Sequence, residues 1–127
     1  MRVLVIDDDP ATTELLRLIL EPMAVTVIIA HSGLEGIRLV EEKTPDIIIL
    51  DLMMPNLDGW EVCKKIRRFS LLPILILSAV DRPKQVAEAL DAGADDYLIK
   101  PILSNILIAH INKILRRHKL AIAPLLA

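Results

Sequence analysis

Residues 46–51 read DIIILD, and this short stretch decides the fold class. Three isoleucines and a leucine between two aspartates have the length of a strand, and they leave no polar face for water. A strand that is apolar on both sides is typical of a parallel sheet covered by helices on both faces. Residues 73–78, PILILS, show the same pattern. We therefore expect an α/β protein.

Apolar runs of this kind occur five times and alternate with helix-like segments. The expected strands are Arg2 to Asp7, Val25 to Ala30, Asp46 to Asp51, Pro73 to Ser78 and Asp95 to Ile99. The expected helices are Pro10 to Glu21, Gly33 to Lys43, Gly59 to Arg68, Pro83 to Ala92 and Ile102 to His118. Because helical crossovers join parallel strands, the alternation predicts a doubly wound, five-stranded parallel sheet. One domain over residues 1–118 contains the whole pattern, and the apolar residues 119–127 are expected to form a tail or the start of a linker.

Two local signals support the expected helices. Asp9 is a suitable cap for the first helix, and Pro10 fits its first position. Gly93 is a suitable left-handed cap at the end of the fourth helix.

Composition excludes several classes of function. Fifteen lysines and arginines against 17 acidic residues give a net charge of −2, so there is no broad positive surface for nucleic acid. The single cysteine, Cys63, has no partner for an internal disulfide and is expected to be a small apolar side chain on a helix. We expect no signal peptide, because the sequence MRVLVIDDD goes straight into a strand-like run, and no apolar run reaches membrane-spanning length. We expect a cytoplasmic protein that contacts neither membrane nor nucleic acid through this domain.

Polar side chains gather where the expected strands end. In chain order these are Asp7, Asp8 and Asp9 after the first strand, Asp51 at the end of the third, Ser78 at the end of the fourth, and Lys100 with Pro101 after the fifth. Ligands of open parallel sheets bind beyond the carboxyl ends of the strands. If these strands are neighbours, the polar groups converge on one pocket.

The chemistry of these groups points to a metal ion and a phosphoryl group. Carboxylates crowded at one sheet edge repel one another unless a cation neutralises them, and oxygen ligands favour Mg²⁺ over Zn²⁺. Lys100 adds a positive charge suited to a phosphoryl oxygen. A carboxylate in such a pocket can act as nucleophile. Asp51 is the best candidate because it stands alone at the end of a central strand, whereas Asp7 and Asp8 are better arranged as metal ligands.

Each residue also has a purely structural interpretation. The aspartates before Pro10 can serve only to cap a helix, Asp51 can be a turn residue, and Lys100 can be a solvated lysine. Their occurrence together at successive strand ends is what favours the phosphoryl-transfer site.

Four segments in the correct order resemble the receiver domain of two-component response regulators, over residues 1–118. They are VLVIDDDP, DIIILDLMMPNLDGWE, PILILSA and AGADDYLIKP. The longer stretch ALDAGADDYLIKP is most similar to receivers of winged-helix transcriptional regulators. The resemblance implies a flavodoxin-like fold with the strand order 2-1-3-4-5.

The resemblance also implies roles for residues of the pocket. Asp51 is the phosphoacceptor, and Mg²⁺ is bound by Asp8, Asp51 and the backbone carbonyl of Met53, with Asp7 assisting through water. Ser78 hydrogen-bonds the phosphoryl group.

Three further positions match the family. Lys100 is the family's lysine, its bond to Pro101 is expected to be cis, and Tyr97 occupies the aromatic switch position. Phosphorylation would favour an inward Ser78, admit Tyr97 into the vacated space, and change the face of the fourth helix, fifth strand and fifth helix.

The implied function is signalling rather than turnover of a substrate. The expected phosphodonor is a histidine kinase or a phosphotransfer protein, and the reaction is limited to phosphorylation and dephosphorylation of Asp51. Further expectations are an output domain beyond the C-terminus and a homodimer through the changing face. A module of the same fold that binds partners without phosphate is the alternative.

The chain departs from the winged-helix class in its last helix. Ile106 and His110 stand where that class usually has Glu and Arg, so the ionic dimer pattern does not carry over directly. Ile106 either widens the core stripe or belongs to a hydrophobic interaction patch, and His110 is expected to be an ordinary exposed histidine. Asp95 and Asp96 pair with Arg116 or Arg117, with a partner, or with nothing.

Two residues beside the pocket, Met53 and Val80, are apolar where the family often has polar groups that influence water access. We therefore expect an acyl phosphate that hydrolyses slowly. Trp60, just beyond the Asp51 loop, is expected to report Mg²⁺ binding through its fluorescence.

Other functions of α/β folds fit the sequence less well. A flavin carrier needs a hydroxyl- and glycine-rich loop where this chain has three aspartates, and a dinucleotide-binding enzyme needs GxGxxG after the first strand. A phosphatase with an Asp-x-Asp loop needs a carboxylate at Met53.

Overall fold

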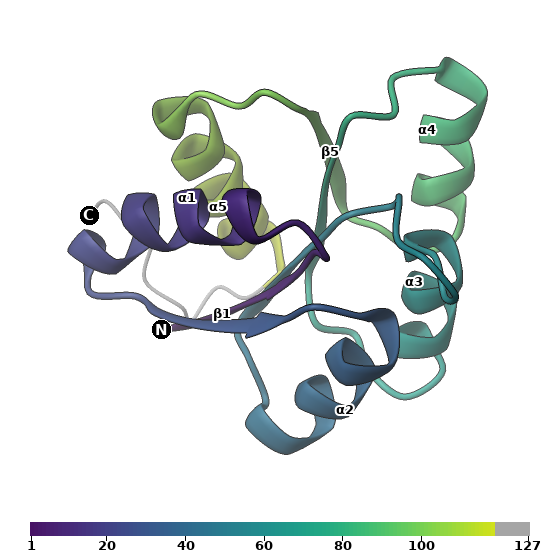
Figure 1. Cartoon of the computed structure of the whole chain (residues 1–127), viewed down its shortest axis with the longest axis horizontal. Helices are drawn as coiled ribbons and strands as arrows, with labels where there is room; N and C mark the ends of the chain where they lie inside the picture. Colours follow the sequence, from purple (N-terminus) through teal and green to yellow (C-terminus); the bar gives the residue numbers. More distant parts are fainter. Residues whose placement is uncertain (119–127) are drawn as a thin grey trace.

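A sheet of five parallel strands forms the centre of the molecule, and the computed structural model describes residues 1–118 around it (Figure 1). The strands are β1 (Arg2–Ile6), β2 (Thr26–Ala30), β3 (Ile47–Leu50), β4 (Ile74–Ser78) and β5 (Asp96–Ile99). Their spatial order is β2-β1-β3-β4-β5, and every neighbouring pair is parallel. The expected strand order is confirmed.

Five helices cover both faces of the sheet. They are α1 (Pro10–Leu20), α2 (Gly33–Lys43), α3 (Gly59–Arg67), α4 (Pro83–Asp91) and α5 (Ser104–His118). Val3 and Val5 of β1 pack in a core with α1 and α5, whereas Leu4 and Ile6 pack in a second core with α2, α3 and α4. This alternation confirms the doubly wound architecture, because successive side chains of a strand point to opposite faces.

The element boundaries differ from the expected ranges by one or two residues. The aspartates of β1 and β3 lie one residue beyond the paired strand, so Asp7 and Asp51 are free to point away from the sheet. The last helix begins at Ser104 instead of Ile102, because the N–H groups of Ile106 and Leu107 bond to the carbonyl of Leu103. The first helix ends at Leu20 and continues as a 3₁₀ turn, Glu21–Met23.

The expected caps are present. The Asp9 side chain accepts a hydrogen bond from the Ala11 N–H, and Pro10 is the first residue of α1. Gly93 has a φ of 118°, and the N–H of Ala94 after it bonds to the carbonyl of Ala89. This pairing is typical of a glycine-terminated helix end.

Gly59 lets the first turn of α3 pack directly on the loop after β3. A Cβ at this position would lie 2.3 Å from the carbonyl oxygen of Asp51. No side chain fits there without a shift of backbone, so the glycine brings α3 against the segment that carries the pocket.

Cys63, membrane-spanning helices and the tail are the remaining features for which the sequence supports an expectation. Cys63 is buried on α3, and burial raises the pKa of its thiol to about 11, so it is a protonated packing residue at neutral pH. No helix within residues 1–118 is long and apolar enough to cross a membrane. The expected tail, residues 119–127, lies outside the described residues.

Candidate functional site

The carboxyl ends of four strands bring polar side chains together in what we call the acidic pocket. It is formed by Asp7, Asp8, Asp51, Ser78 and Lys100. Backbone hydrogen bonds hold these ends in register. The Asp51 N–H donates to the Ile6 carbonyl over 3.0 Å, and the Lys100 N–H donates to the Ser78 carbonyl over 2.9 Å. The pocket is therefore placed by the sheet itself.

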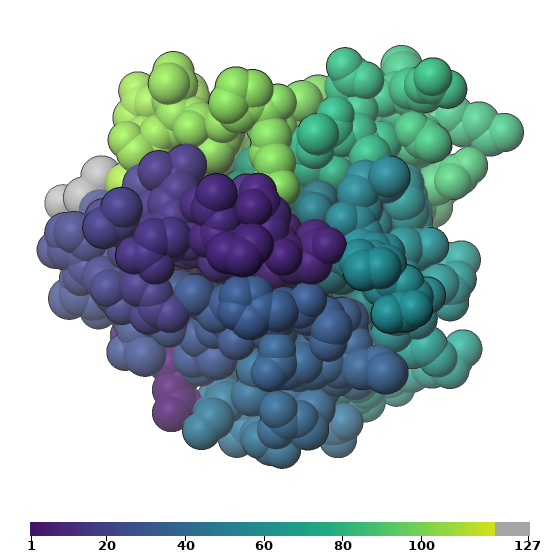
Figure 2. Space-filling model, viewed as in Figure 1, coloured from purple at the N-terminus to yellow at the C-terminus, as the bar shows by residue number. Residues whose placement is uncertain are grey.

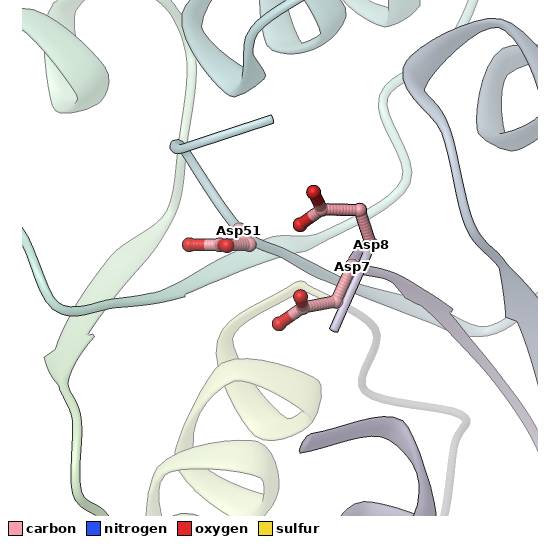
Figure 3. Close-up of side chains that lie close together, drawn as sticks. All are labelled: Asp7, Asp8 and Asp51. Atoms are coloured by element: carbon pink, nitrogen blue, oxygen red, sulfur yellow. The ribbon is translucent and has the colours of Figure 1, made fainter. Parts of the chain in front are cut away.

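Three carboxylates of the acidic pocket face a common space (Figure 3). One oxygen from each of Asp7, Asp8 and Asp51 lies within 4.8 Å of the others. Among residues 1–118, Asp51 Oδ1 is the buried side-chain oxygen that lacks a hydrogen-bond partner. A buried acceptor without a donor is costly unless a cation satisfies it. The donor set consists of hard oxygen atoms, so the residues present fit a hard divalent cation.

The electrostatics of Asp51 reflect its surroundings. Burial raises the pKa of the Asp51 carboxyl, the charge of Asp7 raises it further, and Lys100 opposes both. The Asp51 side chain is 7% exposed. A cation that neutralised Asp7 and Asp51 together would remove the main source of repulsion.

Lys100 reaches both buried carboxylates. Its Nζ lies 2.9 Å from Asp7 Oδ2 and 3.7 Å from Asp51 Oδ2. The other oxygen of Asp7 accepts a hydrogen bond from the Asp9 N–H over 2.9 Å. Asp7 is therefore fixed on both sides, and Lys100 stands closer to Asp7 than to Asp51. The peptide bond between Lys100 and Pro101 is cis.

Ser78 and Tyr97 meet at the loop after β4. The buried Ser78 Oγ accepts a hydrogen bond from the Val80 N–H over 3.3 Å, and the Tyr97 hydroxyl donates to the Val80 carbonyl. Burial raises the pKa of the Tyr97 phenol. One residue, Val80, thus links the serine of the acidic pocket to the aromatic side chain of β5.

Met53 lies in the loop after β3, and Trp60 lies in the first turn of α3. The Met53 side chain is largely exposed, with 61% of the residue accessible to solvent. The Trp60 Nε1 donates to the Gln85 carbonyl over 3.2 Å, so the indole joins the start of α3 to α4. Trp60 is therefore placed to report a movement of α4 as well as events in the loop after β3.

The sequence did not predict a charged cluster between β5 and α5. Asp96 Oδ2 lies 2.6 Å from His110 Nδ1 and 3.0 Å from Lys113 Nζ. Burial alone would raise the pKa of the Asp96 carboxyl, but hydrogen bonds from His110 and Lys113 outweigh it and lower the pKa. His110 and Lys113 are three residues apart on a helix and share a face, which is the signal that could have revealed the cluster.

The structure corrects two expectations for this face: that His110 is exposed, and that Asp95 and Asp96 pair with Arg116 or Arg117. The partners of Asp96 are His110 and Lys113, so His110 is half-buried and bonded instead of freely exposed. Asp95 pairs with Arg67 over 2.9 Å, because that guanidinium is held beside it by bonds to backbone carbonyls, including that of Gly93.

Ile106 does not extend the core stripe. The residue is 40% exposed, since α5 turns Leu107 inward instead. Of the two interpretations of Ile106, exposure favours the hydrophobic surface patch.

A family model described as "Response regulator receiver domain" matches residues 3–112. The chain therefore belongs to the response-regulator receiver domain family of two-component systems. It is similar to the response regulator MprA of Mycobacterium ulcerans, with 46% identity over 121 residues. It is also similar to the transcriptional regulatory protein AfsQ1 of Streptomyces coelicolor, with 44% identity over 115 residues.

These matches cover 94% and 91% of this chain but 52% and 51% of the relatives. The chain thus spans about half the length of the curated relatives it matches.

Solved structures share the fold. A two-component response regulator from Clostridium difficile superposes with a TM-score of 0.90 at 34% identity, covering 94% of this chain and 98% of that one. The receiver domain of the Francisella response regulator 1452 gives a TM-score of 0.86 at 35% identity, covering 93% and 98%.

Proposed function

We propose that this chain is a phosphoacceptor switch in which Asp51 receives the phosphoryl group. The observation that carries the proposal is the buried Asp51 carboxylate, whose Oδ1 lacks a partner beside Asp7, Asp8 and Lys100. Family membership supports the same conclusion, because receiver domains of response regulators are phosphoproteins that use magnesium.

The chemistry follows from position and charge. Asp8, Asp51 and the Met53 carbonyl would hold Mg²⁺, with Asp7 assisting through water. The bound ion would supply neutralisation of phosphoryl charge. An oxygen of Asp51 attacks phosphorus, and the leaving group departs with the electron pair of the broken bond. Lys100 lies within 4 Å of the nucleophile and stabilises the charge on the transferred group.

The signal leaves the acidic pocket through Val80. In the proposed switch, Ser78 turns toward the phosphoryl group, and the loop that Val80 shares with Tyr97 moves with it. The altered face is formed by α4, β5 and α5. Ser78 and Tyr97 are thus the switch residues of the proposal.

The proposed partners follow from the family and from the relatives. A histidine kinase or phosphotransfer protein supplies the phosphoryl group in the cytoplasm. MprA and AfsQ1 are named as regulators and are about twice as long, so we propose that residues 1–118 form the receiver of a longer protein with an output domain. Association of two copies through α4, β5 and α5 is part of the same proposal.

Intact-protein mass spectrometry tests the central claim. Wild-type protein with Mg²⁺ and acetyl phosphate should gain the mass of one phosphoryl group, and Asp51→Asn should not. Beryllofluoride with Mg²⁺ should change Trp60 fluorescence in the wild type alone.

The control is Asp58→Asn, which changes a carboxylate on the same loop that caps α3, with asparagine retaining the cap. This variant should be phosphorylated like the wild type. Phosphorylation of Asp51→Asn to the wild-type extent would overturn the assignment of the phosphoacceptor.

A further inference from the structure

An apolar groove of about 420 Å³ runs between α1 and the loop from β5 to α5. Its apolar walls are formed by Leu15, Leu16, Leu77, Ala79 and Ile102, and Lys100 lines it as well. Small-molecule sites typically have volumes of about 300–1,000 Å³. In the space-filling view, the dark purple start of α1 borders the yellow-green segment that follows β5 (Figure 2). The groove is therefore large enough for a small organic molecule.

The groove adjoins the acidic pocket through two of its lining residues. Lys100 lines the groove and extends its ammonium to 2.9 Å from Asp7 and 3.7 Å from Asp51. Ala79 directly follows Ser78, the serine of the acidic pocket. A molecule whose apolar part lies in the groove can thus present its charged end at Lys100.

The charge pattern indicates what kind of molecule fits. Of the described residues that line the groove, Lys100 is the charged one, and most of the others are apolar. A ligand that matches this pattern has an anionic head and a hydrophobic tail. An acyl phosphate with an aliphatic chain has this form, because its phosphoryl group is the anionic head.

We propose that the groove binds the aliphatic tail of small acyl phosphates. The protein therefore prefers donors with longer aliphatic tails over acetyl phosphate. The inference rests on the proposed function and adds a binding site for the acyl tail of a small donor. An Asp51 oxygen forms a bond to phosphorus while the bond from phosphorus to the acyl oxygen breaks. The electron pair stays on the departing carboxylate, so the products are aspartyl phosphate and a carboxylate anion, with no proton required.

Straight-chain donors measure the effect of the tail alone. Acetyl, butyryl and hexanoyl phosphate release carboxylates of closely similar basicity, so their intrinsic reactivities are similar. Each methylene group that is fully buried contributes about 0.8 kcal/mol, or about fourfold in binding. Because the groove is partly open, we expect an advantage of about tenfold for hexanoyl over acetyl phosphate, expressed in the apparent KM.

The experiment compares initial rates of phosphorylation of the full chain with Mg²⁺, read by intact mass. Leu15→Ser removes an apolar wall at a residue that is 48% exposed, so the variant is expected to fold. Leu18→Ser is the matched control on the same helix, at a residue that is 64% exposed and outside the groove. Wild type and Leu18→Ser should show the dependence on chain length, and Leu15→Ser should lose it.

Equal KM values for the three donors in the wild type would overturn the inference while leaving the phosphoacceptor intact. The same chain-length dependence in Leu15→Ser would also overturn it. If Leu15→Ser slows transfer only from a phosphorylated protein donor, the groove is a protein-docking surface and the inference is wrong. Failure of all three donors to modify Asp51 would overturn the proposed function together with the inference.

Discussion

Asp51 is the residue at which stability and the proposed function oppose each other. Its carboxylate is buried beside Asp7, and one oxygen lacks a donor. The folded protein therefore holds a charge that water would solvate better. Sites that bind a charged ligand commonly retain such a cost in the unbound state.

Asp51→Asn should stabilise the fold at neutral pH by about 1 kcal/mol, because it removes a poorly solvated charge. The pKa of Asp51 is raised on folding, so the wild type regains this stability below the unfolded value of about 3.9. The advantage of the variant should be full at neutral pH and vanish toward pH 3. Urea unfolding across this range measures it. A variant less stable than the wild type at pH 7 would contradict the electrostatic account.

Met53 provides a second prediction at the residue scale. Its exposed thioether cannot hold a water molecule by strong hydrogen bonds. Met53→Asn should therefore shorten the lifetime of phosphorylated Asp51 severalfold, because an amide can orient water near the acyl phosphate. Decay of the phosphorylated mass after removal of donor gives the rate. An unchanged lifetime would show that this side chain does not control water access.

At the scale of the secondary-structure elements, the attachment of β5 to α5 is held by one side chain. Asp96 joins the start of the edge strand to the middle of the helix, and its second oxygen accepts the N–H of Tyr97. A single carboxylate thus ties α5 to the strand that carries the proposed switch. Displacement of α5 would have to break or stretch these bonds.

Asp96→Asn should destabilise the protein by about 1–3 kcal/mol at neutral pH, since charge-assisted hydrogen bonds are lost. The pKa of Asp96 is lowered on folding, so its stabilisation is present above the unfolded value of about 3.9 and is lost as pH falls through the folded value. This dependence has the opposite sign to that of Asp51.

Thermal unfolding of the wild type and of Asp96→Asn at pH 7 and near pH 3 separates the contribution of the Asp96 charge from other effects of the substitution. Glu41→Gln changes an exposed carboxylate on α2 and is expected to be nearly neutral. Equal destabilisation by Asp96→Asn at both pH values would show that charge is not the cause.

At the scale of the whole molecule, most of the fold was predictable from sequence. Apolar runs such as IIIL can be buried only in a covered parallel sheet, and this restriction determines the architecture. The convergence of Asp7, Asp51 and Lys100 followed once the strand order was expected. The spacing of His110 and Lys113 indicated a shared helix face, but that Asp96 is the residue this face meets was not predictable, because it depends on the rotation of α5 about its own axis. Local spacing does not set that rotation, and packing of Leu107 and Ile111 does.

Mg²⁺ should raise the melting temperature of the whole domain by several degrees, because a ligand of the folded state stabilises it by about 2.7 kcal/mol at a hundredfold excess over Kd. Asp8→Asn should lose the effect, since it removes one of the three clustered carboxylates. Asp9→Asn is the control, because asparagine retains the cap and the residue lies outside the cluster. Differential scanning fluorimetry with and without Mg²⁺ provides the measurement. Equal responses from both variants would exclude Asp8 as a ligand.

The ion pair between Lys100 and Asp7 joins residues that are 93 positions apart. During synthesis on the ribosome, β1 and β3 emerge with their aspartates well before the lysine is added. Without Lys100, any pairing of β1 with β3 brings the carboxylates of Asp7 and Asp51 together with no lysine charge to balance them. The lysine that neutralises Asp7 is thus among the last residues of the domain to be synthesised. The pocket acquires the positive charge of Lys100 only when nearly the entire domain has been made.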